Sequence, residues 1–389
     1  MVESDPENPE DRIGAVVALA SSGDSVLVGP GFYYEHIDLQ EKTLTIIGTA
    51  GAGQTILDGS RPPHGLIGGI FSSEGIPGHL NIEGLTLQNG QGSGQWLKGG
   101  AVSYDHRGYG GAFRARDCAF VGNHVESPWG LGGGAIYATA DEVSLERCRF
   151  HGNLVFQNGA VLHVVGFGSV VLSDCELDLD LRLGGTAIFA DTGRIRIEDC
   201  AFRAEDTTQW HAAVFLTVFD AQILRNTMIY EGPSPDFQFL FATSWYPQYS
   251  ARRLVVEDNV IWSKSSVPGA YYRVVDLIPG IADITLRRNT IIGNLKCEYY
   301  GGSPLIMEQN IVVGDALIGG PNGGCVCCND FWQGTLDLPN QGTHVERNLS
   351  LDPMFCDLDG GDLRIARQSP CSGDSVPEGC GRMGALEEA

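Results

Sequence analysis

Short runs of alternating apolar and polar residues recur along most of the chain. A repeat begins with an apolar run after glycines, as in GGGAIYA. A strictly alternating run follows, as in VSLER, and then a third short run, as in RFHGN. Alternation with a period of two is typical of β-strands that bury one face. The pattern therefore predicts three short strands per repeat and an all-β protein.

The junction between the second and third strands carries a recurring phrase, such as ARDCAF, LERCRF and IEDCAF. Cysteine fills its central slot at intervals of roughly 25 to 30 residues, which is the spacing of solenoid repeats. Gly84 takes the same slot earlier in the chain. The residues in the slot after it are Cys118, Cys148, Cys175, Cys200, Asn226, Asn259, Asn289, Asn310 and Asn348.

We predict that this slot is a tight corner whose side chain points inward and stacks on its counterpart in the next coil. Asparagine tolerates a left-handed backbone and can donate hydrogen bonds along such a stack. Cysteine is a small hydrophobic residue that fills the same space. A zinc site would need thiolates that converge on one point, whereas a ladder spreads them along an axis. Buried free thiols are therefore favoured over disulfides or a metal at these four cysteines.

The repeats predict a single-stranded right-handed parallel β-helix, a solenoid, with a cap at each end. A solenoid has to cover its open ends, because the last coils expose unpaired backbone and apolar side chains. The segment PEDRIGAVVALA has helix-like apolar spacing and suits an N-terminal helical cap. We expect an N-terminal segment and cap at residues 1–23, the β-helix at 24–350 and a disulfide-stapled C-terminal cap at 351–389.

The C-terminal region contains the other seven cysteines. Their crowding in loop-like sequence predicts disulfides and an oxidising compartment. Cys371 and Cys380 are expected to close a small loop, while the remaining connectivity is open and one thiol is left over. The run CVCCND can instead hold a metal, although few histidines lie near it. The seven residues are Cys297, Cys325, Cys327, Cys328, Cys356, Cys371 and Cys380.

Composition limits the classes of partner that the protein is expected to bind. The formal net charge is −23, which argues against nucleic acid, because phosphates require neutralisation by Lys and Arg. No run of eighteen apolar residues is present, so the sequence predicts no transmembrane segment. The start, MVESDPENPEDR, shows no signal peptide. The disulfides nevertheless lead us to expect an extracellular or cell-surface protein.

The repeats resemble a known group of proteins. DSVLVGPGFYYEHIDLQEKTLTIIG, from Asp24 to Gly48, is similar to the first coil of secreted proteins of the pectin-lyase-like superfamily. The units of the type GGGAIY to RCRFHGN resemble repeats of bacterial surface β-helix proteins. LDPMFCDLDGGDLRIARQSPC, from Leu351 to Cys371, resembles a closing segment of that group. The resemblance covers nearly the whole chain, but its motifs specify architecture rather than chemistry.

The resemblance suggests where to look for chemistry. Polysaccharide lyases on this fold use Ca²⁺ held by carboxylates, with Lys or Arg as base or charge neutraliser. In DCELDLDLR, alternation places Glu176, Asp178 and Asp180 on one face of a strand. We therefore take Asp178 and Asp180 as candidate Ca²⁺ ligands and Arg182 as a candidate catalytic residue; the alternative is a solvated strand. His211, at a strand entrance, is a second catalytic candidate.

Aromatic residues supply the candidate binding surface. Alignment of the first strands predicts an outward-facing, exposed column beside an inward-facing column that begins with Val102 and Ile136. A shift of one residue would exchange the two columns. Exposed apolar columns are typical of binding grooves or protein interfaces. The predicted column contains Ser103, Tyr137, Leu162, Phe189, Phe215, Phe241 and Val275. Trp210 and Trp245 are expected to extend this surface.

Two functions follow from this sequence. The first is an extracellular carbohydrate-binding or polysaccharide-processing β-helix, lyase- or glycosidase-like, with a glycan along the first sheet. The alternative is a non-catalytic cell-surface or filament-forming protein that assembles through the aromatic column. The same fold hosts both classes, so the sequence leaves catalysis open.

Overall fold

The structure is a computed structural model of the 389-residue chain. It divides into two compact units, residues 1–195 and 196–389, which are described one at a time. The described residues are 13–39, 41–60, 69–75, 78–93, 98–106, 110–126, 132–155, 158–180, 185–205, 211–232, 237–242, 253–264, 273–277, 283–298, 305–319, 324–338, 343–373 and 375–387.

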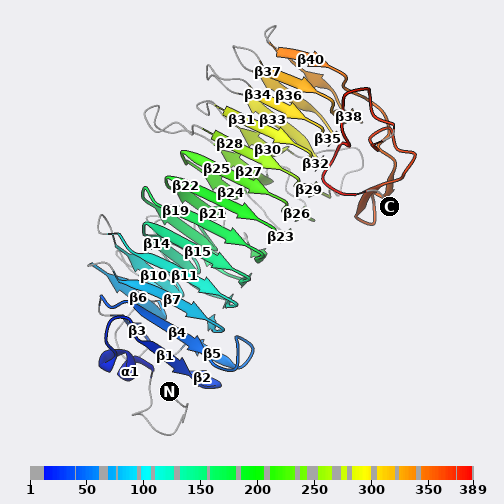
Figure 1. Cartoon of the computed structure of the whole chain (residues 1–389). Helices are drawn as coiled ribbons and strands as arrows, with labels where there is room; N and C mark the ends of the chain where they lie inside the picture. Colours follow the sequence, from blue (N-terminus) through cyan, green and yellow to red (C-terminus); the bar gives the residue numbers. More distant parts are fainter. Residues whose placement is uncertain are drawn as a thin grey trace. The chain divides into compact units, whose positions relative to one another are not determined.

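Unit 1 is a parallel β-helix in which each coil contributes one strand to each of three parallel sheets (Figure 1). The first sheet contains β3 (Ile37–Asp38), β6 (Phe71–Glu74), β10 (Val102–Asp105), β14 (Ile136–Thr139), β18 (Leu162–Val165) and β21 (Gly185–Asp191). The second contains β1 (Ser25–Val28), β4 (Leu44–Gly48), β7 (His79–Glu83), β11 (Ala112–Arg116), β15 (Glu142–Glu146) and β19 (Ser169–Ser173). The third contains β2 (Gly31–Tyr33), β5 (Thr55–Asp58), β8 (Thr86–Gln88), β12 (Ala119–Val121), β16 (Arg149–His151) and β20 (Glu176–Asp180).

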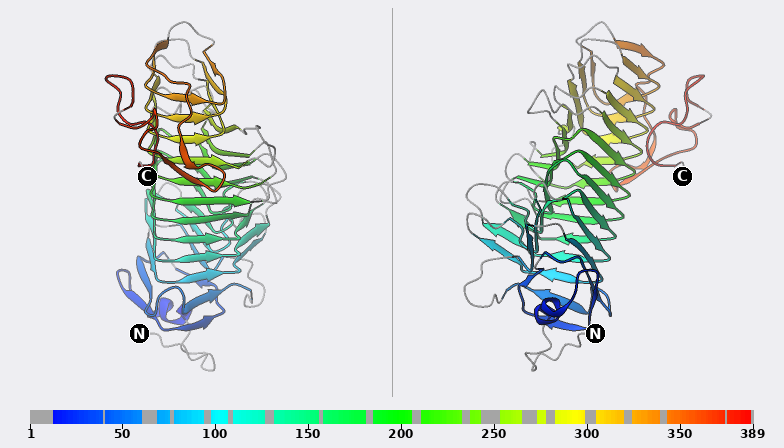
Figure 2. Two further views of the ribbon diagram at one scale, coloured as in Figure 1. Left: turned by 90° about the vertical axis from the view of Figure 1, so that its right-hand side faces the viewer. Right: turned by 60° about the vertical axis from the view of Figure 1, so that its left-hand side comes forward.

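Unit 2 repeats this arrangement, and the stacked parallel strands of each unit are visible in Figure 2. Its first sheet contains β24 (His211–Leu216), β27 (Phe237–Ala242), β30 (Arg273–Leu277), β33 (Asn294–Glu298), β36 (Ala316–Gly319) and β39 (Leu336–Asp337). Its second contains β25 (Asp220–Leu224), β28 (Arg253–Glu257), β31 (Asp283–Arg287), β34 (Leu305–Glu308), β37 (Gly324–Cys327) and β40 (Thr343–Glu346). Its third contains β23 (Ala201–Glu205), β26 (Thr227–Tyr230), β29 (Val260–Ser263), β32 (Thr290–Ile292), β35 (Ile311–Val313) and β38 (Asp330–Trp332). Strand β22 (Arg194–Glu198) contains the boundary between the units.

A few elements lie outside these sheets. In unit 1, β9 (Gln91–Ser93), β13 (His124–Glu126) and β17 (Leu154–Val155) form a small parallel sheet, and in unit 2, β41 (Phe355–Asp357) and β42 (Asp362–Ile365) pair antiparallel. The all-β parallel β-helix predicted from the repeats is therefore confirmed. Among the described residues, no helix is long and apolar enough to cross a membrane.

The helix expected near the N-terminus is α1 (Ile13–Leu19). The carboxylate of Glu35 accepts hydrogen bonds from the backbone N–H groups of Ile13 and Gly14, at 3.0 and 2.9 Å. At the other end, Lys42 Nζ donates to the carbonyls of Val17 and Ala18, at 2.9 and 2.8 Å. An acid at the N-terminus and a base at the C-terminus of a helix satisfy its unpaired backbone groups and oppose its dipole.

Alternation in the second strands places the core as predicted. Phe113 and Ala115 of β11 are buried, whereas Arg114 and Arg116 are exposed. The third strands add stacked rings to the same interior, and Phe120 lies 4.9 Å from Phe150, measured between ring centroids. Each coil therefore buries its own apolar positions against those of the neighbouring coils.

The corner phrase is confirmed as an inward-facing ladder. In unit 2, Asn259 Nδ2 donates to Asn289 Oδ1 at 3.0 Å, and Asn259 Oδ1 accepts from Asn226 Nδ2 at 3.0 Å. In unit 1, the thiol of Cys148 interacts with those of Cys118 and Cys175, and these contacts together with burial raise its pKa. All four predicted ladder cysteines are buried thiols that take part in no disulfide, as expected.

The left-handed residue of the corner is not the one that we expected. Positive φ occurs one position earlier, for example at Asp117, Arg147 and Arg225, with φ of 50°, 50° and 55°. The inward side chain therefore needs an ordinary backbone, and the residue before it makes the turn. Because left-handed backbone is costly for residues other than Gly, Asn and Asp, arginine at this position indicates that the fold imposes the turn.

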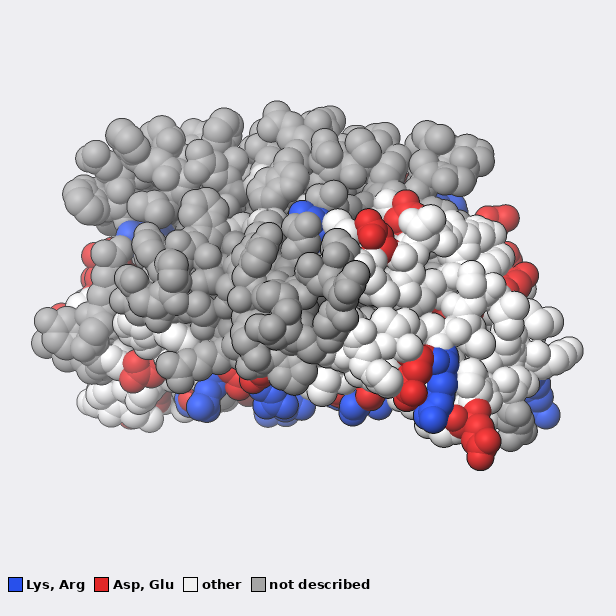
Figure 3. Space-filling model, turned by 90° about the horizontal axis from the view of Figure 1, so that it is seen from above, with Lys and Arg blue, Asp and Glu red and all other residues white. Residues whose placement is uncertain are grey.

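These turn residues form ion pairs between coils, on the outside of the corner. Arg147 Nε lies 2.7 Å from Asp117 Oδ1 in unit 1. In unit 2, Arg225 Nη2 lies 2.6 Å from Asp199 Oδ2, and Arg288 Nε lies 2.6 Å from Asp258 Oδ1. Figure 3 shows that basic and acidic side chains of the described residues lie next to one another on this view of the surface.

A second asparagine ladder in unit 1 was missed by the sequence analysis. Asn123 Nδ2 donates to Asn153 Oδ1 at 3.0 Å, and both side chains are buried. The two residues end the phrases FVGN and FHGN, so the repeated Gly-Asn after the third strand was the available signal.

The C-terminal segment is attached by a disulfide, as predicted, but through a different pair. Cys328 is bonded to Cys380, and Cys325 to Cys327, while Cys371 is a buried free thiol. The predicted Cys371–Cys380 loop is therefore wrong. Burial and the nearby carboxylate of Asp330 raise the pKa of the Cys371 thiol, and its Sγ donates to Asp330 Oδ2 at 3.2 Å.

The same segment covers the outer side of the third sheet of unit 2. Leu363, Ile365 and Met383 form an apolar cluster with side chains of β29 and β35, among them Trp262 and Ile311. By contrast, Val345 in the last second-sheet strand, β40, is 44% exposed. The C-terminal segment therefore packs on the outer side of the third sheet, and it leaves Val345 in the last coil exposed.

Candidate functional site

The outer face of the first sheet of unit 1 carries an aromatic column. Strand register aligns Ser103 with Tyr137, Tyr137 with His163 and His163 with Phe189. The ring of Tyr104 lies 6.0 Å from that of Phe113, which belongs to the core. Because neighbouring residues of a strand point to opposite faces, Ser103 and its column point away from the core, as predicted.

The predicted column is wrong at two positions. Tyr137 aligns with His163 rather than Leu162, and Phe241 aligns with Asp276 rather than Val275. The predicted outward placement of Leu162 would turn its neighbour His163 to the interior, and this is wrong as well. The run AVLHV has three consecutive apolar residues, so hydrophobicity alone does not select between two registers that differ by one residue.

Neighbouring rings in the column lie close together at tilted angles, but most of them are not exposed. Ring centroids lie 5.3 Å apart for Tyr137 and His163 and 4.8 Å apart for His163 and Phe189. Tyr137 and His163 are only 3% and 2% exposed, whereas Phe189 is half-buried. The expectation of a fully exposed ladder is therefore wrong, and Phe189 is the accessible member in unit 1.

A short column of the same kind occurs in unit 2. Phe215 aligns with Phe241, and their ring centroids lie 5.0 Å apart. Phe215 is buried and Phe241 is half-buried. The next residue in register, Asp276, is buried and accepts a hydrogen bond from Gln238 Nε2 at 3.3 Å.

Polar groups lie beside the column in unit 1. Lys98 Nζ is 2.6 Å from Asp105 Oδ2 and 4.8 Å from the centroid of the Tyr137 ring. Thr139 Oγ1 donates to the other oxygen of Asp105 at 2.7 Å. The side chains of Lys98 and Asp105 are 11% and 15% exposed, so this ion pair has little contact with solvent. We call Lys98, Asp105, Tyr137, Thr139, His163 and Phe189 the first-sheet cluster.

Two polar atoms on this outer face have no hydrogen-bond partner within the described part of the chain. They are Ser103 Oγ and His163 Nδ1. Burial lowers the pKa of His163 to about 4, so the ring is neutral at neutral pH. Buried polar atoms without a partner are uncommon and point to a ligand or a water molecule.

Several predicted site residues fall where the structure gives no side-chain description. Arg182, Trp210 and Trp245 lie outside the described residues. His211 is the first residue of β24, but its side chain is not described. Their predicted roles in catalysis and binding stay predictions.

The predicted acidic face exists. Glu176 and Asp178 are exposed and Asp180 is half-buried, while the intervening leucines are buried. Asp178 Oδ2 lies 2.6 Å from His151 Nδ1, and Glu176 Oε2 lies 3.0 Å from Arg149 Nε. Two of these carboxylates thus contact basic groups, whereas Ca²⁺ takes six to eight oxygen ligands. Calcium at Asp178 and Asp180 stays a prediction, to be tested by calorimetric titration.

An open cleft of about 550 Å³ runs along the outside of the corner in unit 1. Its charged lining includes Arg147, Arg149, Asp174 and Glu176. Arg147 and Arg149 are paired with acids of other coils. The cleft is therefore a solvated surface with compensated charge, and none of the described residues that line it is aromatic.

Comparison of the chain with protein-family models, with curated proteins and with solved structures gave no match.

Proposed function

We propose that this chain is an extracellular carbohydrate-binding β-helix protein of the pectin-lyase-like superfamily. The glycan would lie along the outer face of the first sheet of unit 1. The observation that carries the proposal is the outward-facing column of Tyr137, His163 and Phe189 beside the largely buried ion pair of Lys98 and Asp105.

The chemistry of this face suits a neutral sugar. Aromatic rings offer flat apolar surfaces with a polar edge, which match the C–H face of a pyranose. His163 Nδ1 and the Ser103 hydroxyl are the two polar groups of this face without a partner among the described residues. Such groups can pair with sugar hydroxyls without bringing an uncompensated charge into a buried place.

The described groups favour binding over catalysis. The low pKa of His163 makes it a weak base at neutral pH. Lys98 is held as the charged partner of Asp105, so it is not a free base either. A lyase or glycosidase activity would have to come from other residues, such as Arg182 and His211.

An extracellular location is part of the proposal. Two cysteine pairs are bonded, and disulfides persist in oxidising compartments. Detection of the full-length protein in the culture medium or on the cell surface of its native source would support it. Retention in the cytosol would contradict it.

The test is direct binding to a panel of neutral and acidic oligosaccharides, followed by calorimetry on any that bind. We expect Phe189→Ala to weaken binding by about fivefold, because one aromatic contact is worth about 1 kcal/mol. We expect His163→Phe to weaken it as well, because the ring remains but its nitrogens are lost. Phe32→Ala is the matched control, since Phe32 is an exposed aromatic elsewhere in unit 1.

Two results would overturn the proposal. One is an absence of binding to every glycan in the panel. The other is assembly of the protein into trimers or fibres that Phe189→Ala dissociates, which would support the alternative of a filament-forming surface protein.

A further inference from the structure

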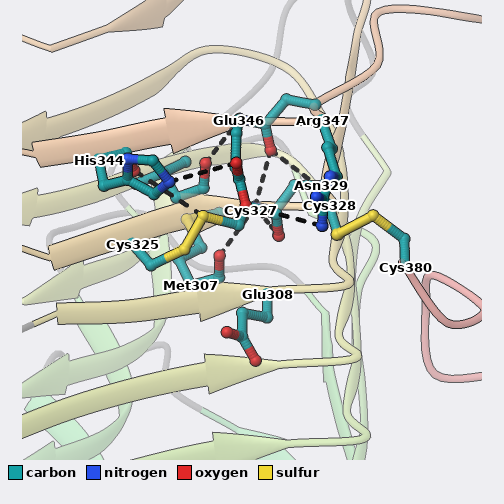
Figure 4. Close-up of a disulfide and its surroundings, with 12 residues drawn as sticks. Met307, Glu308, Cys325, Cys327, Cys328, Asn329, His344, Glu346, Arg347 and Cys380 are labelled. Carbon is teal, nitrogen blue, oxygen red and sulfur yellow. Dashed lines mark hydrogen bonds and ion pairs between the residues drawn. A yellow bond between two sulfur atoms is a disulfide. The ribbon is translucent and has the colours of Figure 1, made fainter. Parts of the chain in front are cut away.

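Four side chains that can bind metals share one face of the last two second-sheet strands in unit 2. Register aligns Cys325 of β37 with His344 of β40, and Cys327 with Glu346. Val326, between the cysteines, is fully buried. Because successive residues alternate between faces, the two cysteines and their partners lie on the outer face, which Figure 4 shows.

The distances between the ligand atoms suit binding to a single metal ion. One ligand atom each from Cys327, His344 and Glu346 lies within 4.8 Å of the other two. His344 Nε2 lies 3.3 Å from Glu346 Oε2. Ligands about 2.0 to 2.3 Å from a tetrahedral zinc ion are about 3.3 to 3.8 Å from one another. Side-chain movements of about 1 Å would therefore bring the ligand atoms of Cys327, His344 and Glu346 to binding distance from one zinc ion.

The structure has the two cysteines bonded to each other. They are two residues apart in sequence, so this disulfide closes a very small loop. The stabilisation that a disulfide gives through the unfolded chain grows with loop size, and the Cys328–Cys380 bond, with a separation of 52 residues, is far better placed to give it. A stabilising role therefore explains the Cys328–Cys380 bond better than it explains the Cys325–Cys327 bond.

We propose that Cys325, Cys327, His344 and Glu346 form a zinc site that is available only when the Cys325–Cys327 bond is reduced. Thiolate and imidazole ligands favour Zn²⁺ over Ca²⁺ or Mg²⁺, which prefer oxygen ligands only. The bonded sulfurs cannot serve as thiolates, so the disulfide closes the site and its reduction opens it.

Two chemical steps lead from the disulfide to the zinc site. A dithiol reductant transfers two electrons and two protons to the disulfide, which becomes two cysteine thiols, while the dithiol becomes a cyclic disulfide. Zn²⁺ then binds two thiolates and the two thiol protons pass to solvent. His344 binds as neutral imidazole and Glu346 as carboxylate. Arg347, with Nη1 3.7 Å from Glu346 Oε1, is placed to orient that carboxylate.

The experiment titrates the full-length protein with Co²⁺, a spectroscopic substitute for Zn²⁺, without oxygen. It compares protein kept oxidised with protein reduced by a water-soluble phosphine, which becomes the phosphine oxide and leaves the thiols free. We expect one Co²⁺ per reduced chain with thiolate charge-transfer absorption, its displacement by Zn²⁺, and no such signal from the oxidised chain.

Variants assign the signal to these residues. Cys327→Ser and His344→Ala should each weaken Co²⁺ binding about 10-fold or more. His79→Ala, which removes an exposed histidine of unit 1, should leave it unchanged. A Cys328→Ser, Cys380→Ser background excludes the thiols of the other disulfide, and Cys356→Ser excludes the exposed free thiol.

Two outcomes would overturn the proposal. One is equal Co²⁺ binding by the oxidised and reduced chains. The other is equal binding by the reduced parent and by the His344→Ala protein with an unchanged melting temperature. Because His344 is exposed, this second variant tests the site even if Cys327→Ser fails to fold.

Discussion

Arg225 and Asn226 are neighbours in sequence, but the corner places them in opposite environments. Asn226 is buried; its Oδ1 accepts from the N–H of Cys200 at 3.0 Å and its Nδ2 donates to the carbonyl of Ile197 at 2.9 Å. The Arg225 side chain is 47% exposed and pairs with Asp199. Exposed ion pairs add little to the free energy of unfolding, whereas buried polar groups without partners lower it strongly. The inward residue Asn226 therefore stabilises the corner more than Arg225 does.

The first prediction compares substitutions at these two positions. Asn226→Ala should lower the free energy of unfolding by about 2 to 4 kcal/mol, because it leaves two buried backbone groups without partners. Arg225→Met should lower it by less than about 1 kcal/mol, and by still less at high salt. Denaturant unfolding of both proteins measures the difference. Equal losses would contradict the inward ladder as the main source of stability.

The second prediction concerns pH and His163. Its folded pKa of about 4 lies below its ordinary value of 6.5, so between these values the unfolded chain binds a proton that the folded chain does not. This contribution to stability is complete above pH 6.5. It is lost as pH falls toward 4, by up to about 3 kcal/mol.

His163→Phe keeps a ring in the column and should remove that part of the pH dependence. Chemical denaturation at pH 7 and at pH 4.5 measures it, and His79→Gln at an exposed position serves as control. An unchanged slope in the His163→Phe protein would show that His163 is protonated as easily in the folded state as in the unfolded one.

Residue identity predicted some of these features. The slot occupied by Cys148 and Asn259 was predicted to point inward because small and amide side chains recur there. The left-handed turn was placed one residue too late, since asparagine favours that backbone on intrinsic grounds. Arg147 and Arg225 adopt it because the coil requires a sharp turn, and no local preference of arginine indicates this.

At the scale of elements, the second and third strands were easier to predict than the first. In β15 and β20 strict alternation of apolar and polar residues selects one register. In β18, consecutive apolar residues allow two registers, and the difference moved His163 from the predicted interior to the outer face. The aromatic column could therefore be assigned to the first sheet, but not residue by residue.

The third prediction concerns helix α1. Glu35 accepts from two N–H groups at its first turn, so Glu35→Ala should destabilise the protein by about 1 kcal/mol, as loss of a helix cap does. Hydrogen exchange of the amides of Ile13 and Gly14, together with thermal melting, measures the effect. Glu83→Ala, on the outer face of β7, is the matched control. Unchanged exchange at Ile13 and Gly14 would contradict the capping role.

At the scale of the whole molecule, sequence predicted a stapled C-terminal segment but not the pairing. Cys380 is close in sequence to Cys371, yet it is bonded to Cys328, 52 residues away. Cys371 is instead buried against Asp330. Pairing depends on which coils the segment covers. This depends on the apolar cluster that includes Met383 and Ile311, which no local pattern reveals.

The fourth prediction follows from that bond. Cys328→Ser combined with Cys380→Ser should destabilise the protein by about 2 to 4 kcal/mol. It should also speed hydrogen exchange in β41 and β42 more than in β29. Cys356→Ser, at an exposed free thiol, should change neither quantity. Equal protection of β41 and β42 with and without the bond would show that the apolar cluster alone holds the segment in place.

Asn226 and Asn259 contact each other from positions 33 residues apart, and the same contact recurs between Asn259 and Asn289. The ladder thus has interchangeable members. Excision of one full turn, from Asn226 to Asp258, would bring Asn259 to the place that Asn226 now holds. Such a shortened protein should keep its fold, whereas removal of about half a turn would move every later strand out of line with its present sheet. Lineages that carry this architecture can therefore gain or lose length in whole turns.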